Sequence, residues 1–231
     1  MSRTVVIHQP DFLSYAGFFH RLLHADLYIA LDHVQFVNGT SRSWTHRDKI
    51  KTPRGEQWLT VGVRKAPRDS AINTIELSAT DWRVKNLNLL RENYRQAPHF
   101  EPVFAEIEKL YAIPCSRLAE FNLASIDMLL RMFDISIPIV PSSSLQPAGH
   151  RNELLVDILG KVGATHYLSG VGARDYFDPA PFAAAGIDVV WQDFRHPEYH
   201  QLHGAFVPYL SSIDMLFNCG IERSREILRS C

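Results

Sequence analysis

The sequence predicts an α/β fold: a doubly wound, mostly parallel sheet with a β-hairpin and a helical insertion in the middle. Short apolar runs alternate with amphipathic helical stretches at both ends of the chain, as in β-α-β units. A turn separates two β-rich runs within residues 46–63, and the stretch 80–134 is helical in character. The chain has 231 residues, and we expect one α/β domain over 1–231, with 80–134 as a helical insertion or cap.

The N-terminal segment predicts one β-α-β unit. Residues 4–9 form an apolar run, residues 17–25 have an apolar helical face that begins at Phe18, and residues 26–32 form a second apolar run. Strands joined through a helix lie parallel, so these runs predict two neighbouring parallel strands.

The next segment predicts a hairpin around the turn "TPRG", with "HRDKIK" as its outgoing strand and "QWLTVGV" as its returning strand. Side chains alternate between the two faces of a strand. We therefore expect Asp48 and Ile50 on one face, and Lys49 and Lys51 on the other.

The middle of the chain predicts three helices. One begins at Thr80 or Asp81 and ends before Pro98, a short one covers residues 102–111, and Ser116 caps a longer one. The methionines of the longer helix are expected to fill gaps in the core.

The C-terminal part returns to alternating strands and helices. A glycine closes the first helix of this part, which favours a left-handed C-cap. The predicted elements are strands over residues 135–145, 165–170 and 186–194, a helix over 151–164 and a helix that begins at Ser211 or Ser212.

Composition narrows the function classes. The formal net charge is −1, so no overall field attracts nucleic acid or an anionic membrane surface. No secretory signal and no long apolar segment is apparent, so membrane insertion is not expected. Three widely spaced cysteines favour reduced thiols and a cytoplasmic location.

Polar residues end several predicted strands. In an open α/β sheet, ligands bind outside the carboxyl ends of the strands, so these residues predict a polar site at one edge. The alternative for each is structural: Pro10 stops the first strand, and a single histidine is more often hydrogen-bonded in the core. The strand-end residues are His8, Gln9, Asp32, Ser142, Ser143, Ser144, Ser169, Gly170 and Asp193.

The basic hairpin stretch is a candidate anion site. Arg47 and Lys51 suit a diphosphate or a carboxylate, by bidentate and point-charge contacts respectively. A solvated hairpin face is the alternative.

Three histidines follow the last predicted strand with the spacing H-x3-H-x2-H: His196, His200 and His203. Their segment contains Pro197 and has no acidic or cysteine ligand at a familiar spacing, so no metal site is predicted. A role for histidine as a general base or a hydrogen-bonding group is favoured instead.

The first β-α-β unit resembles that of the nucleotidylyltransferase superfamily, whose loop has an H-x-G-H motif. This chain departs from the motif, because Tyr15 and Phe18 flank Gly17 where histidines would be needed. A bound nucleotide would then use His8 as its phosphate partner. The chain also contains neither a Walker A motif nor a G-x-G-x-x-G sequence after a strand.

Nearly the whole chain resembles the WbqC-like family of bacterial proteins. The resemblance is carried by "IHQPDFLSYAGFFHRL", "LDHVQF", "HRDKIKTPRGEQWLTVGV", "THYLSGVGARDYFD" and "WQDFRHPEYHQLHGAFVPYLSSIDMLFNCG". It implies a cytoplasmic role in making precursors of O-antigen, the polysaccharide of lipopolysaccharide, or of other surface polysaccharides. The chain departs from the family pattern at His33 and His200.

The resemblance assigns polar positions to the site. His8, His203 and His196 are the predicted catalytic residues. The predicted substrate-binding residues are Gln9, Asp32, Gln35, Arg47, Lys51, Ser169, Gly170, Tyr176 and Asn218.

The leading hypothesis is a transferase that adds an acyl or aminoacyl group to a nucleotide-linked amino sugar. Arg47 and Lys51 would hold the diphosphate, and His8 or His203 would deprotonate the amine. No resident cofactor is predicted, and a nucleotide or an acyl donor is the expected cosubstrate. The alternatives are nucleotidyl or adenylyl transfer, and a non-catalytic binding module of the same pathway. The sequence does not define the oligomeric state.

Overall fold

A five-stranded parallel sheet forms one half of the molecule. The computed structural model describes residues 2–39 and 43–231, and of residues 175 and 176 it describes the backbone alone. The strand order is β5-β2-β1-β6-β7, and all four neighbouring pairs are parallel. The chain thus winds outward from β1 to β5 and then returns beside β1, which confirms the predicted doubly wound sheet. The strands are β1 (Thr4–His8), β2 (Leu27–Ala30), β5 (Ile139–Pro141), β6 (His166–Ser169) and β7 (Asp188–Trp191).

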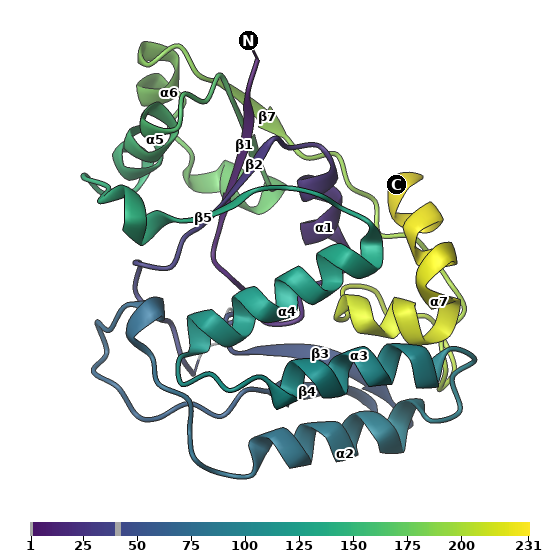
Figure 1. The fold of residues 1–231 in the computed structure, drawn as a ribbon. Coiled ribbons are helices and arrows are strands. Elements are labelled where there is room, and N and C mark those ends of the chain that lie inside the picture. The colour runs from purple at the N-terminus through teal and green to yellow at the C-terminus, as the bar shows by residue number, and fades with distance from the viewer. Residues whose placement is uncertain (1, 40–42) are drawn as a thin grey trace.

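Helices cover both faces of this sheet (Figure 1). On one face, α5 (Asn152–Lys161) and α6 (Ala180–Ala184) pack against Val5 and Ile7 of β1. On the other face lies α1 (Ala16–Leu23), together with the larger apolar cluster that contains Val6. Successive β1 side chains therefore enter opposite cores, which is why this strand is apolar throughout.

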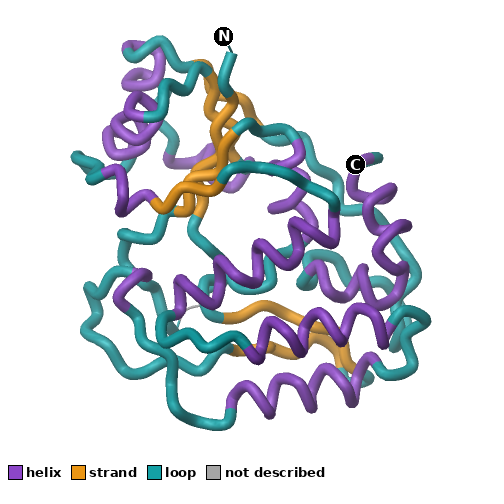
Figure 2. Tube along the Cα trace, viewed as in Figure 1, coloured by secondary structure: helices purple, strands orange, loops and turns teal. Residues whose placement is uncertain are grey.

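The hairpin forms a separate layer, visible as the second group of strands in Figure 2. β3 (Arg47–Thr52) and β4 (Gly55–Thr60) pair antiparallel. Asp48 and Ile50 are both buried, and Lys49 is partly exposed, as the alternation predicts. Lys51, which was expected on the same face as Lys49, is buried and only 2% exposed.

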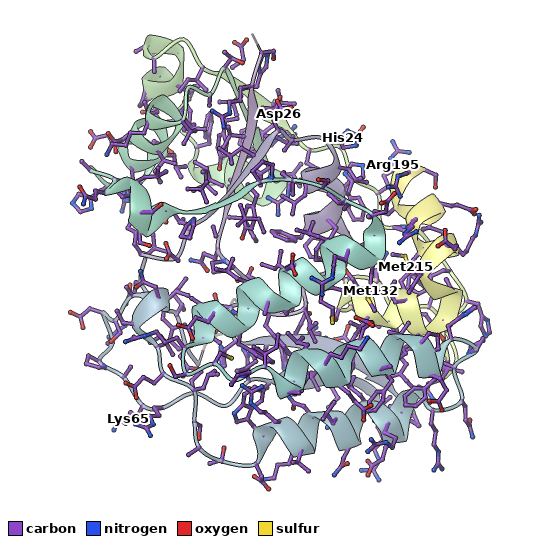
Figure 3. The ribbon with its side chains drawn as sticks, viewed as in Figure 1. His24, Asp26, Lys65, Met132, Arg195 and Met215 are labelled. Carbon is purple, nitrogen blue, oxygen red and sulfur yellow. The ribbon has the colours of Figure 1, made fainter. Side chains whose placement is uncertain are left out.

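The remaining helices pack around the hairpin. The largest apolar cluster of the described residues runs from the sheet through the hairpin and these helices. Within it α4 (Leu118–Phe133) packs against α7 (Ser212–Arg229), and Met132 of α4 and Met215 of α7 are both buried in this cluster (Figure 3). The single-domain organisation, with residues 80–134 as an insertion or cap, stays a prediction. The helices are α2 (Trp82–Tyr94), α3 (Phe100–Ala112), α4 (Leu118–Phe133) and α7 (Ser212–Arg229), and three 3-10 helices cover Ile72–Thr74, Ser142–Leu145 and Val171–Tyr176.

Element boundaries differ from the predictions at three places. The strand predicted over 135–145 is limited to β5, because the serines after Pro141 turn into a 3-10 helix. The N-cap of α4 is Arg117 rather than Ser116, and the Glu120 carboxylate accepts both backbone N–H groups. The long C-terminal helix is kinked at Gly220.

None of the helices in the described part of the chain is both long enough and apolar enough to span a membrane.

Candidate functional site

A cavity of about 300 Å³ lies at the carboxyl end of β1. This volume is at the lower end of the range for small-molecule sites. Its polar lining comes from β1, from the loop after it, from α1 and from β3. These polar residues are His8, Asp11, Ser14, Arg21 and Asp48.

The position of the cavity follows from the winding of the sheet. The connection after β1 leads through α1 to β2, while the connection after β6 leads through α6 to β7 on the opposite side. The two loops diverge and leave a crevice at this topological switch point. His8 ends β1 and Gly170 follows β6. His8 lines the cavity directly, and Gly170 lies beside Arg21, which is another lining residue.

His8 and Asp11 form an interacting pair in the lining. Nε2 of His8 lies 3.2 Å from Oδ2 of Asp11. The loop holds Asp11 in place, because its backbone N–H donates to the Gln9 carbonyl and Ser14 Oγ donates to the Asp11 carbonyl. A neutral imidazole whose Nε2–H donates to a carboxylate keeps the lone pair of Nδ1 available as a base. The pair is therefore equipped to accept a proton from a ligand.

Asp48 brings a second carboxyl group to the cavity from the buried face of β3. Burial raises its pKa well above the ordinary value, and the negative charge of Asp11 adds to this effect. The backbone N–H of Lys49 donates to it and lowers the pKa in part. Burial is the largest of these effects, so it favours the neutral form of Asp48, which can donate a hydrogen bond.

Aromatic rings form the rest of the wall: Tyr15, Phe18, Trp44 and Tyr209. Burial raises the pKa of Tyr15, which keeps its phenol neutral. The Tyr15 ring lies over Gly17, where a Cβ would collide with this ring and approach the Phe194 ring to 2.9 Å. Glycine at position 17 thus allows the tyrosine to close this side of the cavity.

The rim of the cavity continues onto the hairpin surface. Trp44 lines the cavity, is 36% exposed, and lies 5.2 Å from Trp58 between ring centroids. The Arg47 guanidinium lies 4.1 Å from the Trp58 ring centroid. A planar group and an anion can both be bound by such an aromatic and cationic surface. We call Trp44, Arg47 and Trp58 the hairpin rim.

Two predicted site residues, Lys51 and His203, instead anchor the loop before α7. The ammonium of Lys51 donates to Gln201 Oε1 at 3.1 Å, to the Gly204 carbonyl at 3.0 Å and to the Ala205 carbonyl. Nε2 of His203 donates to the Asn93 carbonyl at 2.8 Å. The structure brings neither residue to the cavity beside His8.

Asn218 belongs to the same anchoring region. Its side-chain oxygen accepts the backbone N–H of Leu202, and its amide donates to the Asp214 carbonyl. His196 lies nearer the cavity, because its ring is 5.2 Å from that of Tyr209. Burial lowers the pKa of His196, which keeps the imidazole neutral beside this aromatic wall.

The other predicted residues hold loops at the carboxyl edge of the sheet. Asp32 accepts hydrogen bonds from Ser142, Ser143 and Asn73, so it ties the end of β2 to the end of β5. The hydrogen bonds of Asp32 therefore hold loops of the fold together.

The side chains of Gln9 and Gln35 each make one hydrogen bond in the described chain. Gln9 Oε1 accepts from Thr45, and Gln35 Nε2 donates to the Arg68 carbonyl. Ser169 is buried at the end of β6. Tyr176 lies outside the residues whose side chains the structure describes. The functional roles predicted for all four stay predictions.

We expect Lys51→Met to lower stability without changing ligand affinity. Loss of the ammonium removes its hydrogen bonds to two loop carbonyls and to Gln201, at a cost of about 2 kcal/mol in the free energy of unfolding. Urea unfolding measures this loss. Lys65→Met is the control, because Lys65 is exposed on a loop away from the sheet (Figure 3). Equal stability of the two variants would contradict the anchoring role.

Sequence reasoning missed Asp11, Arg21, Asp48 and Tyr209. Two of them, Arg21 and Asp48, could have been recognised from the sequence pattern. Arg21 lies three residues after Phe18, on the face of α1 that enters the core, where a charged residue is unusual. Asp48 shares the buried face of its strand with Ile50.

Within the residues that the structure describes, no three His, Cys, Asp or Glu side chains are placed to hold one metal ion.

Comparison with known proteins gives the family. The model of the WbqC-like protein family matches residues 9–226. The chain is also 31% identical over 232 residues to "Uncharacterized protein Rv1507c" of Mycobacterium tuberculosis, with 99% of each chain covered. No solved structure matches. The chain belongs to the WbqC-like protein family.

Proposed function

We propose that this member of the WbqC-like protein family is an enzyme of surface polysaccharide precursor synthesis, O-antigen included. It transfers an acyl or aminoacyl group to the amine of a nucleotide-linked amino sugar, in the cytoplasm. The observation that carries the proposal is the His8–Asp11 pair, at 3.2 Å, in a cavity at the topological switch point of the sheet. Such a crevice is where α/β enzymes bind their ligands.

The hairpin rim supports a nucleotide outside the cavity. Trp44 and Trp58 offer faces on which a base can stack, and the Arg47 guanidinium, whose Nε donates to the Ser43 carbonyl, adds a positive charge beside them for the diphosphate. The sugar then reaches inward toward His8. Lys51 takes no part in this arrangement, because its ammonium is bonded within the fold.

The transfer step assigns one role to each polar group. The amine nitrogen attacks the acyl carbonyl carbon, a C–N bond forms, and Nδ1 of His8 accepts the amine proton. The bond from the carbonyl carbon to the donor's leaving group breaks, and the leaving group departs with its electron pair and is then protonated. The neutral form of Asp48, which burial favours, donates a hydrogen bond to the carbonyl oxygen as negative charge develops there. His8 is the general base, and Asp11 orients it.

The polar lining argues against a nucleoside triphosphate inside the cavity. The described lining residues include one guanidinium, two carboxyl groups and no lysine. Three phosphate groups need more cationic partners or a metal ion.

A thermal-shift panel with the full-length chain tests the proposal. We expect stabilisation by a UDP- or dTDP-linked amino sugar, or by an acyl thioester, and loss of the sugar effect in Trp44→Ala. Stabilisation by ATP or CTP with Mg²⁺ alone would favour nucleotidyl transfer instead. Absence of any shift with the sugars and thioesters would overturn the assignment.

A further inference from the structure

Arg21 is a buried cation without a hydrogen-bond or ion-pair partner among the described residues. It projects from α1, is 5% exposed, and lines the cavity. No hydrogen bond or ion pair to its guanidinium is found in the described part of the chain, and Nε is enclosed without a partner. Its described contact is with the Phe18 ring, whose centroid is 5.9 Å away. Burying an unpaired charge is costly, so such a group is expected where a ligand supplies the missing anion.

Gly170 brings the backbone close to this guanidinium. A Cβ at position 170 would lie 3.2 Å from Nη1 of Arg21. The loop after β6 therefore lies against one side of the guanidinium. The backbone conformation of Gly170 is ordinary, with φ of −73°, so the space beside Arg21 accounts for glycine here.

A second atom without a partner belongs to the same cavity. Three buried side-chain nitrogen or oxygen atoms lack a hydrogen bond in the described chain: Arg21 Nε, Asp11 Oδ1 and Asn122 Oδ1. Two of these belong to residues that line the cavity. Arg21 needs an acceptor with negative charge, and Asp11 needs a donor. A ligand that carries an anionic group and an amino group supplies the acceptor for Arg21 and the donor for Asp11.

The charge balance favours a carboxylate as the anion. One guanidinium matches one carboxylate in charge and in bidentate geometry. A phosphate dianion would retain excess negative charge close to the Asp11 carboxylate, which also lines this cavity.

We infer that Arg21 binds a carboxylate of the substrate, and that the substrate is an amino sugar acid, a hexuronic acid bearing an amino group. This inference rests on the proposed function, since it names the acceptor sugar for the same cavity. The carboxylate lies on Arg21, and the amine lies at the His8–Asp11 pair, where it is to be acylated.

Binding of free sugars tests the inference directly. The probes are glucosaminuronic acid, glucuronic acid, glucosamine and inorganic phosphate, titrated into the full chain by NMR or calorimetry. We expect the first to bind at least 10-fold more tightly than glucosamine. In Arg21→Gln that preference disappears, and in the surface control Arg223→Gln it is retained. Tighter binding of phosphate than of either acid, or an unchanged preference in Arg21→Gln, would overturn the inference.

Stability without ligand gives a second test, which also covers variants that fold poorly. Arg21→Met keeps the aliphatic length and removes the unpaired charge, so Tm is expected to rise by about 3 °C. Arg223→Met, which removes an exposed arginine paired with Glu226, is expected to change Tm little. A lower Tm in Arg21→Met would indicate a structural cation and would contradict a ligand-binding role.

The two proposals can fail separately. His8→Gln removes the base and keeps Arg21, so it is expected to bind glucosaminuronic acid. Arg21-dependent binding of the acid without any transfer by the wild-type enzyme would leave the carboxylate site standing and refute the transferase. Transfer to neutral and acidic amino sugars at equal kcat/KM would leave the transferase standing and refute the carboxylate site.

Discussion

His8→Gln is expected to lower the turnover of acyl transfer by about 10²–10⁴-fold, the usual contribution of a positioned general base. The glutamine amide can still donate a hydrogen bond to Asp11, but it has no basic nitrogen. KM for the nucleotide sugar should change little, because the hairpin rim and Arg21 still bind the substrate. Steady-state kinetics with a nucleotide-linked amino sugar and an acyl donor measure both constants.

The control for this variant is His150→Gln, since His150 is exposed in the turn before α5. Its kinetics should match those of the wild type. A higher KM with unchanged kcat in His8→Gln would assign His8 to binding, and the base would have to be sought elsewhere. Asp11→Asn should lower kcat by a smaller factor, because the imidazole remains but loses its partner.

Gly220→Ala is expected to lower the free energy of unfolding by about 3 kcal/mol. Gly220 has φ of 79° and ψ of 168°, a region open essentially to glycine, and other residues there cost about 1–3 kcal/mol. A Cβ would also lie 2.7 Å from Nδ1 of His99, so the imidazole ring must move. The kink at Gly220 seats α7 against the start of α3, since the His99 backbone N–H donates to the Phe217 carbonyl.

Gly160→Ala is the matched control for Gly220→Ala. Gly160 lies within α5, and no atom outside its own helix lies within 4 Å of the position its Cβ would take. Alanine there should raise the free energy of unfolding by about 0.5–1 kcal/mol, through its better helix propensity. Urea unfolding curves of the three proteins give the comparison. If Gly220→Ala were as stable as the wild type, the strained kink would not exist in solution.

The fold could be predicted from the sequence because each local signal agreed with the others. Apolar runs followed by helical faces specify parallel strands, and the "TPRG" turn specifies the hairpin. The short length of β5 could not be predicted from the sequence. The apolar run before Pro141 has the pattern of a strand whether or not neighbouring strands pair with it. Pairing is a tertiary property that a single run does not contain.

The candidate site could be predicted only in part. The strand-end rule placed His8 and Gly170 at the same edge of the sheet, because parallel strands all end at the same edge. Lys51 and His203 were predicted from the basic hairpin and from the family resemblance, and the structure places both away from this cavity. A polar side chain beside a loop can satisfy backbone carbonyls as well as a ligand. Arg21 was overlooked because helical periodicity was used only to find the apolar face, although a charge on that face was the informative exception.

The crystal structure of the full chain with a UDP-linked aminohexuronic acid tests most directly that the cavity at the end of β1 is the substrate site. We predict the sugar inside this cavity, with its carboxylate about 2.7–3.2 Å from the Arg21 guanidinium and its amine within hydrogen-bond reach of His8. Binding in the hollow lined by Gln9, Leu31 and Leu154, with the cavity beside Arg21 left without the sugar, would contradict it.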